Sequence, residues 1–340
     1  MAAQQTVAQA ATTGFDNAPA YDAHRPSYPP EAVGSLLAHL GVADKAGARI
    51  IDLAAGTGKF TELLAARGEG YEVVAVEPVA RMRESLERKR LGRVDVRHGL
   101  ATEMGVEDGW ADAVIAAQVR MPFFPRPDWK RKQGDQEKGI DVYFQDAGLP
   151  QDQGFTNMVN PVGSATNKSF HWFANEESLK EIRRVLKPGG KLGVIWNIED
   201  YNQPPGWTAS TKWEDGVKQL VLALPPDGID RFRDDKWWQV FERQASASEP
   251  YFAAPIGRET VSFTAWRTKE LLWDRINTLS QVAVLRGHEK DMFKARFDEI
   301  FENGDQVWND EGEVEFHGVT TLRGSIRDGW VRYWQSNQIA

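Results

Sequence analysis

The stretch IIDLAAGTGKF, residues 50–60, decides the fold, because it joins a short apolar run to a glycine-rich turn. Ile50, Ile51 and Leu53 are typical of a buried strand, and Gly56-Thr57-Gly58 ends that strand before a helical pattern begins. In α/β proteins such a turn lies at the carboxyl edge of the sheet, where ligands bind. The turn therefore raises the question of which ligand it accepts.

Strands and helices alternate on both sides of this stretch. Apolar runs predict strands over 49–53, 72–76, 94–96, 112–117, 191–197, 261–263 and within 314–326. Helical spacing of apolar residues predicts helices over 30–40, from Phe60 through Leu64, and over 81–93, 175–186, 268–279 and 289–302, with Asn175 as a cap and Lys187-Pro188-Gly189-Gly190 as a stop. This alternation predicts an α/β fold with a mostly parallel sheet covered on both faces.

Composition excludes several classes of protein. The chain has 340 residues, 41% of them hydrophobic, and a net charge of -8, which disfavours nonspecific binding to nucleic acid or anionic membranes. It has no cysteine, which excludes disulfides, thiolate nucleophiles and Cys-ligated metal. The histidines show no ligand spacing, so we predict no metal. Residues 1–20 are expected to be a disordered tail without a signal sequence, and the protein to be soluble and cytoplasmic.

Three ligands compete for the glycine turn. A phosphate loop needs Lys followed by Ser or Thr, whereas Phe60 follows Lys59. A dinucleotide fingerprint needs a third glycine where Thr61 stands. S-adenosylmethionine needs bare backbone and a carboxylate at the end of the next strand for its ribose, and Glu77 occupies that place. The turn and the acid alone leave the last two ligands open.

The wider chain resembles the class I S-adenosylmethionine-dependent methyltransferases, particularly the small-molecule group with the methyltransferase type 11 domain and its fungal members. The residues that carry the resemblance are YDAHRPSYPPE (21–31), DLAAGTGKFT (52–61), VVAVEP (73–78), HGLATEM (98–104), DAVIAAQ (112–118), SFHWFANEESLKEIRRVLKPGGKLGVIWN (169–197) and RTKELLWDRINTLS (267–280). The resemblance implies a Rossmann-like methyltransferase fold with a seven-stranded mixed sheet, helices on both faces and a helical cap.

By position, the resemblance implies a cofactor seat built from the first glycine loop. Gly56, Thr57 and Gly58 would lie under the methionine portion of S-adenosylmethionine. Ala54 would belong to the same seat, and Asp52 would hold the loop.

The resemblance also assigns the rest of the cofactor site. Glu77, followed by Pro78, would bind the ribose diol, and Ala101 with Thr102 would lie beside the adenine. Gln118, at the end of the fourth strand, would face the methionine portion or the acceptor.

Three further positions complete the predicted site. Tyr21 and Arg25 would close it from the N-terminal side, although Arg25 could equally make a surface ion pair. His171 is the candidate catalytic residue: it could act as a general base, or as a packed ring that gates the pocket, and we favour the second role.

Residues 119–168 depart from the family pattern. Family members run from the fourth strand directly into the aromatic motif, whereas here fifty residues without helical or strand periodicity intervene. This irregular insertion is either a tolerated surface loop or the translation of an unspliced intron. It divides the predicted cofactor-binding core into 21–118 and 169–200.

Two further regions follow the predicted core. Residues 201–255 are predicted to form a helical cap or substrate lid, and 256–330 the C-terminal part of the fold. The tryptophans at 207, 213, 237 and 238 are either core packing or a lid over an apolar acceptor. The basic run from Arg81 to Arg93 is interpreted as a solvated helix face.

The expected function is transfer of a methyl group from S-adenosylmethionine to a small-molecule acceptor by in-line displacement, with a carboxylate or a secondary metabolite among the candidate acceptors. The alternative is a protein that binds the cofactor but is inactive because of residues 119–168. No nucleic-acid or membrane partner is expected.

Overall fold

The computed structural model describes residues 27–117, 175–225, 238–245 and 247–326. The strands are β1 (Arg49–Leu53), β2 (Glu72–Val76), β3 (Val94–Arg97), β4 (Ala111–Ala117), β5 (Leu186–Glu199), β6 (Gly257–Arg267) and β7 (Val314–Ile326). The helices are α3 (Pro30–Leu40), α4 (Lys59–Ala65), α5 (Ala80–Arg88), α8 (Glu176–Val185), α9 (Lys212–Leu222), α10 (Gln239–Ala245), α11 (Lys269–Asn277), α12 (Ser280–Ala283) and α13 (Gly287–Glu302), with a 3-10 turn over Asp200–Asn202.

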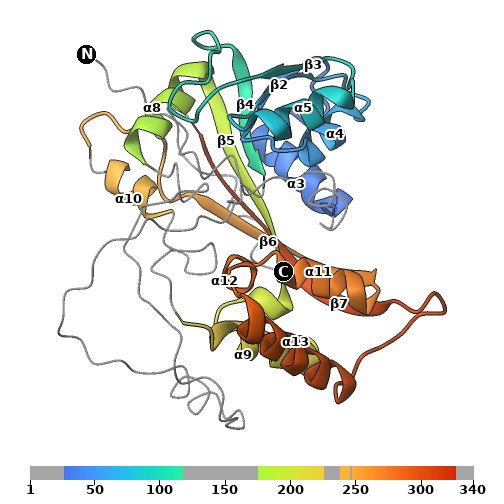
Figure 1. The fold of residues 1–340 in the computed structure, drawn as a ribbon. Helices are drawn as coiled ribbons and strands as arrows, with labels where there is room; N and C mark the ends of the chain where they lie inside the picture. The colour runs from blue at the N-terminus through green and yellow to red at the C-terminus, as the bar shows by residue number, and fades with distance from the viewer. Residues whose placement is uncertain (1–26, 118–174, 226–237, 246, 327–340) are drawn as a thin grey trace.

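All seven strands form one sheet in the order β3-β2-β1-β4-β5-β7-β6. β1 to β5 pair in parallel, and β7 is antiparallel to both β5 and β6. The predicted fold class, a seven-stranded mixed sheet with helices on both faces, is therefore confirmed. Because β7 runs against β5, its first residues lie at the carboxyl edge of the parallel strands (Figure 1).

The two faces of the sheet have separate cores, because successive side chains of a strand point to opposite faces. Ile50 packs on the face covered by α3 and α4, through residues such as Leu36 and Leu64. Ile51 packs on the other face, covered by α8 and α10.

Local signals begin and end several helices where the sequence predicts. Pro30 occupies the first turn of α3, and Gly41 ends that helix at φ 71°. The Asn175 side chain accepts a hydrogen bond from Ser178 N, which caps α8 as expected. Thr268 caps α11 in the same way.

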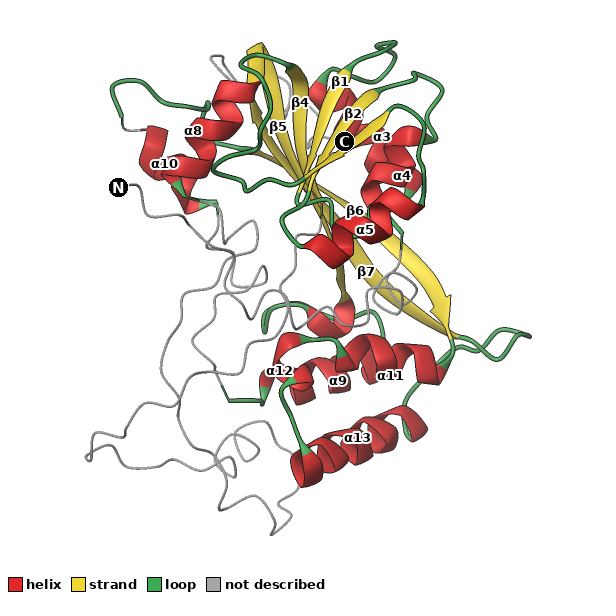
Figure 2. Ribbon diagram, turned by 45° about the horizontal axis from the view of Figure 1, so that its top comes forward, coloured by secondary structure: helices red, strands yellow, loops and turns green. Residues whose placement is uncertain are grey.

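A third core joins α9, α11, α12 and α13, which we call the helical cluster (Figure 2). Trp213 of α9 is 1% exposed and contacts Phe301 of α13 edge-on, with ring centroids 5.4 Å apart. Phe316 of β7 belongs to the same core, so the cluster lies at the carboxyl edge of the sheet. Within 201–255, α9 belongs to this cluster, whereas α10 packs on the main sheet.

The predicted tryptophans differ in their surroundings. Trp213 is core packing, whereas Trp207 is 37% exposed and donates from Nε1 to Asp200 Oδ1 at 3.0 Å. Trp238 is partly buried, with the Arg323 guanidinium 5.8 Å from its ring centroid. Trp237 lies outside the described residues. The predicted lid role of these residues and the predicted domain boundaries stay predictions.

Three element boundaries differ from the sequence expectation. The basic helix ends at Arg88 and not at Arg93, and Arg90 and Arg93 adopt positive φ of 49° and 60°. Lys187-Pro188-Gly189-Gly190 is not a break between helix and strand but the irregular start of β5, where the register with β4 shifts. β6 is longer than the predicted 261–263 because its pairing with β7 extends over Gly257–Arg267.

Candidate cofactor site

The glycine loop between β1 and α4 has a left-handed backbone at three positions. Ala54, Gly56 and Gly58 have φ of 58°, 60° and 86°. A Cβ on Gly58 would lie 2.2 Å from Leu86 Cδ1, whereas the closest atom to a Cβ on Gly56 would be Met82 Sδ at 3.7 Å. Gly58 therefore allows Leu86 of α5 to pack directly against the loop, whereas Gly56 is favoured by its left-handed backbone and a Cβ there would make only an ordinary contact with Met82.

Glu77, directly after β2, is held to this loop through its carboxylate. Its Oε2 accepts a hydrogen bond from Gly56 N at 2.9 Å, and its Oε1 accepts one from Val79 N at 2.8 Å. The side chain is buried, and burial raises the pKa of Glu77 to about 7, against the lowering effect of the two backbone hydrogen bonds. The carboxylate is fixed in position and keeps lone pairs for hydroxyl donors.

Asp52 is a second buried carboxylate beneath the loop. Its Oδ2 accepts a hydrogen bond from Thr61 Oγ1 at 2.6 Å. Its Oδ1 has no hydrogen-bond partner among the described residues, although the residue is only 1% exposed. Burial raises the pKa of Asp52 to about 6, and the hydrogen bonds from Thr61 oppose this shift. An unpaired buried carboxylate oxygen is energetically costly unless a ligand donates to it.

The predicted adenine-binding residues occupy a tight turn after β3. Leu100 N donates to Glu103 O at 2.9 Å and Glu103 N donates back at 3.0 Å, so Ala101 and Thr102 form the tip of the turn. Gly99 is required before it, because a Cβ there would lie 2.8 Å from Val76 Cγ1. This contact brings the turn against the end of β2.

The remaining predicted site residues divide into two groups. Thr57 is buried within the loop, and Pro78 is half-buried after Glu77. Tyr21, Arg25, Gln118 and His171 lie outside the described residues, as does the insertion over 119–168.

The hydrogen-bond acceptors of the site bear on which of the ligands left open by the sequence would fit. Glu77 and Asp52 offer carboxylate oxygens that accept hydrogen bonds from hydroxyl or ammonium groups. Two buried carboxylates next to the loop disfavour a pyrophosphate, since like charges repel in a low-dielectric site. The residues present fit a ribose diol and a cationic methionine portion, since carboxylate oxygens accept hydrogen bonds from hydroxyls and attract positive charge.

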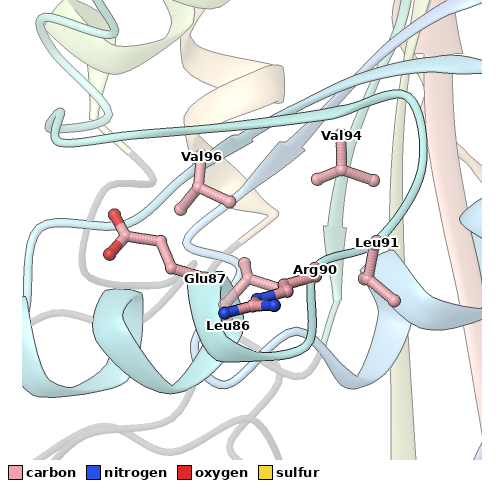
Figure 3. Close-up of a pocket in the computed structure, with 6 residues that line it drawn as sticks. All are labelled: Leu86, Glu87, Arg90, Leu91, Val94 and Val96. Carbon is pink, nitrogen blue, oxygen red and sulfur yellow. The ribbon is translucent and has the colours of Figure 1, made fainter.

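A separate cavity of about 220 Å³ opens on the outer edge of the sheet (Figure 3). Its lining comes from the end of α5, the following turn and β3: Leu86, Glu87, Arg90, Leu91, Val94 and Val96. None of these residues belongs to the predicted cofactor site. Leu86 separates the two places, because the same side chain fills the space above Gly58.

The described ranges contain neither a cluster of metal-ligating side chains nor a membrane-spanning helix. No group of His, Asp or Glu side chains there has an arrangement that could hold a metal ion. No helix there has the length and apolar character needed to cross a membrane.

Sequence reasoning missed three contributors to the site. Thr61 appears in the sequence only as the residue that replaces a third glycine, yet its hydroxyl orients Asp52. Leu86 and Val79 gave no signal in the sequence. Leu86 contacts Gly58 and Val79 N donates to Glu77, and both contacts depend on the position of α5 over the loop in the folded protein. A hydroxyl residue in the first turn of the next helix, nine positions after a buried acid, could have indicated Thr61.

The structure shows an α/β protein with a seven-stranded mixed sheet and a glycine loop after β1 that is joined to the buried Glu77 carboxylate. A family model described as "Methyltransferase domain" matches residues 50–134. An uncharacterized methyltransferase-like protein of Schizosaccharomyces pombe is 29% identical over 289 residues, covering 85% of this chain and 86% of that protein. An uncharacterized methyltransferase of Mycobacterium tuberculosis H37Rv is 29% identical over 261 residues, covering 77% of this chain and 74% of that protein.

A crystal structure of a putative methyltransferase from Bacillus halodurans is similar at 18% identity and a TM-score of 0.42, covering 86% of this chain and 99% of that one. The family model, the relatives and the strand order together support a class I S-adenosylmethionine-dependent methyltransferase.

Proposed function

We propose that the protein transfers the methyl group of S-adenosylmethionine to a small-molecule acceptor. The observation that carries the proposal is the pairing of Glu77 with the glycine loop: a buried carboxylate, fixed by Gly56 N, lies beside backbone that has no side chain. This arrangement offers acceptors for ribose hydroxyls directly next to space for the methionine portion.

Each residue of the site has a distinct task in this proposal. Glu77 accepts hydrogen bonds from the ribose hydroxyls while its backbone partners keep it in place. Asp52 holds the start of α4 through Thr61 and presents Oδ1 as a further acceptor. Ala101 and Thr102 form the turn that would border the adenine.

The cofactor, when bound, supplies a methyl group that is already activated for transfer. The protein therefore needs no covalent nucleophile, and its contribution is to align an acceptor atom at about 3 to 3.5 Å from the methyl carbon. The helical cluster lies at the carboxyl edge of β5, the same edge of the sheet that carries the glycine loop, and we expect it to exclude water from an acceptor.

Calorimetry of the full chain with S-adenosylmethionine and S-adenosylhomocysteine tests the cofactor assignment. Both compounds should bind the parent protein, and Glu77→Ala should weaken both. Glu72→Ala is the matched control: this carboxylate stands at the other end of β2, is exposed and lies 3.2 Å from Arg49, so its loss should leave cofactor affinity unchanged. Binding of NADH but of neither methionine compound would overturn the proposal.

Transfer itself is tested with methyl-labelled cofactor and a panel of small carboxylates, phenols and amines. Label in any acceptor supports a methyltransferase and identifies the methylated atom. Tight cofactor binding without transfer to any member of a broad panel, in both the full chain and a form lacking residues 119–168, would favour a binding protein without turnover. Transfer only by the shortened form would assign the loss of activity to that segment.

A further inference from the structure

β6 is a long strand at the margin of the sheet. Its eleven residues pair with β7 in an unbroken register, from Gly257 opposite Gly324 to Arg267 opposite Val314. It is the last strand in the sheet order, and no described residue forms a backbone hydrogen bond with its outer side. Edge strands are usually protected by charged side chains, proline, a bulge or shortness; β6 has no lysine, proline or bulge and is eleven residues long, and its charged residues are Arg258, Glu259 and Arg267.

The two faces of β6 differ in chemistry. Its odd-numbered residues are turned toward α3 and the helical cluster: Glu259 accepts hydrogen bonds from Ser35 Oγ at 2.7 Å, and the Phe263 ring lies 6.4 Å from that of Phe316. The even-numbered residues from Arg258 to Thr264 are exposed. The strand therefore has an ordered inner face, a hydroxyl-rich outer face and an edge with which no other described strand pairs.

We propose that β6 pairs with β6 of a second copy of this chain, antiparallel and centred on Ser262. In this register Ser262 lies opposite its own counterpart, and Thr260 lies opposite Thr264 of the partner subunit. The two sheets would then form one continuous sheet across a twofold axis. Every outward backbone group of β6 near the axis would gain a partner.

The residues of β6 are complementary to themselves in this register. Hydroxyl residues face hydroxyl residues around the axis, a pairing that stabilises antiparallel strands. Arg258 lies opposite Trp266 of the partner subunit, which suits a cation–π contact. On the inner face, Val261 lies opposite Phe263 of the partner subunit, so no like charges oppose each other.

Self-complementarity favours a second copy over an unrelated peptide. A twofold interface requires that each residue suit the one related to it by symmetry, and β6 satisfies this condition at each pair around the axis. Strand pairing alone gives a narrow contact, whereas stable interfaces bury about 800 Å² per partner. The dimer is therefore expected to form at micromolar concentrations and to dissociate on dilution.

The absence of cysteine from the chain allows a direct test. Ser262→Cys places a single thiol at the axis, where antiparallel partners have Cα atoms about 4.5 to 5.5 Å apart, within reach of a disulfide. Thr260→Cys is the matched control, because its thiol would oppose Thr264 of the partner subunit and not itself. Both side chains are exposed, so neither substitution disturbs the core.

Mild oxidation should link Ser262→Cys into a covalent dimer and leave Thr260→Cys without a covalent link, while a mixture of Thr260→Cys and Thr264→Cys should cross-link. Sedimentation of the parent chain should give twice the mass of 38.2 kDa at micromolar concentration. Thr260→Lys combined with Thr264→Lys should return the protein to a monomer by repulsion. A parent that sediments as a monomer would overturn the proposal. So would Ser262→Cys and Thr260→Cys, each oxidised alone, cross-linking to the same extent.

Discussion

Replacing Asp52 by asparagine should stabilise the ligand-free protein at neutral pH and above. Burial raises the pKa of Asp52 from 3.8 to about 6, so the folded state holds its proton more strongly than the unfolded state. Its contribution to stability is fully present below pH 3.8 and is lost as the pH rises through about 6. A shift of this size corresponds to about 3 kcal/mol at 1.36 kcal/mol per pKa unit.

The asparagine variant removes the buried charge but keeps the shape of the side chain. Its Oδ1 can still accept from Thr61 Oγ1, while its Nδ2 replaces the unpaired Asp52 Oδ1 as an unsatisfied group, which costs about 1 kcal/mol. We therefore expect a net stabilisation of about 2 kcal/mol at pH 8 that disappears near pH 4.

Urea denaturation of the parent and of Asp52→Asn at pH 4, 6 and 8 measures this effect. Asp112→Asn provides a control of opposite sign, because Lys187 and Lys45 outweigh burial and hold the pKa of Asp112 at about 2. That carboxylate stabilises the fold above its unfolded pKa and ceases to do so as the pH falls through about 2, so Asp112→Asn should destabilise the protein at pH 8. A pH-independent difference between Asp52→Asn and the parent would refute the reasoning. The same variant should bind S-adenosylmethionine more weakly, since it lacks the acceptor beneath the loop.

Three further outcomes are expected. Gly58→Ala should destabilise the protein by about 3 kcal/mol through strain and contact with Leu86, and Leu86→Ala should recover part of that loss in a double-mutant cycle. Affinity for S-adenosylmethionine should decrease by about tenfold per pH unit below about 7 as Glu77 gains its proton, which calorimetry at several pH values measures; a flat profile would contradict the assigned role. Arg275→Ala should cost about 3 to 5 kcal/mol in thermal or urea unfolding, because the buried Glu199 carboxylate would lose its guanidinium partner, whereas Arg275→Met with Glu199→Leu should cost much less.

Much of the parallel half of the sheet could be predicted from local patterns. β1, β2 and α3 have the predicted bounds, since apolar runs, a proline and glycines mark their ends within a few residues. The length of β6 could not be predicted, because its polar residues become strand only through pairing with β7, far away in the chain. The end of α5 at Arg88 was also missed, since nothing in the basic composition of this segment indicates where the helix ends.

The candidate site was predictable to the extent that its residues follow strand ends. Glu77 was predicted to be a site residue from its place after the second strand, and in the structure its carboxylate accepts a hydrogen bond from Gly56 N. The loop also packs under Leu86. This contact depends on the position of α5 over the loop in the folded protein, and no sequence pattern indicates it. The unpaired oxygen of Asp52 was equally invisible, because only coordinates reveal which atoms lack a partner.

The composition of the helical cluster has a consequence for biosynthesis. α9 leaves the ribosome well before α11 to α13, and Phe316 of the final strand is required to complete the core that α9 shares with them. Until that strand emerges, the apolar side of α9 has no permanent cover and is a natural target for chaperones. Nascent chains that stop short of β7 should therefore aggregate or be degraded, even though the parallel strands β1 to β5 are already complete.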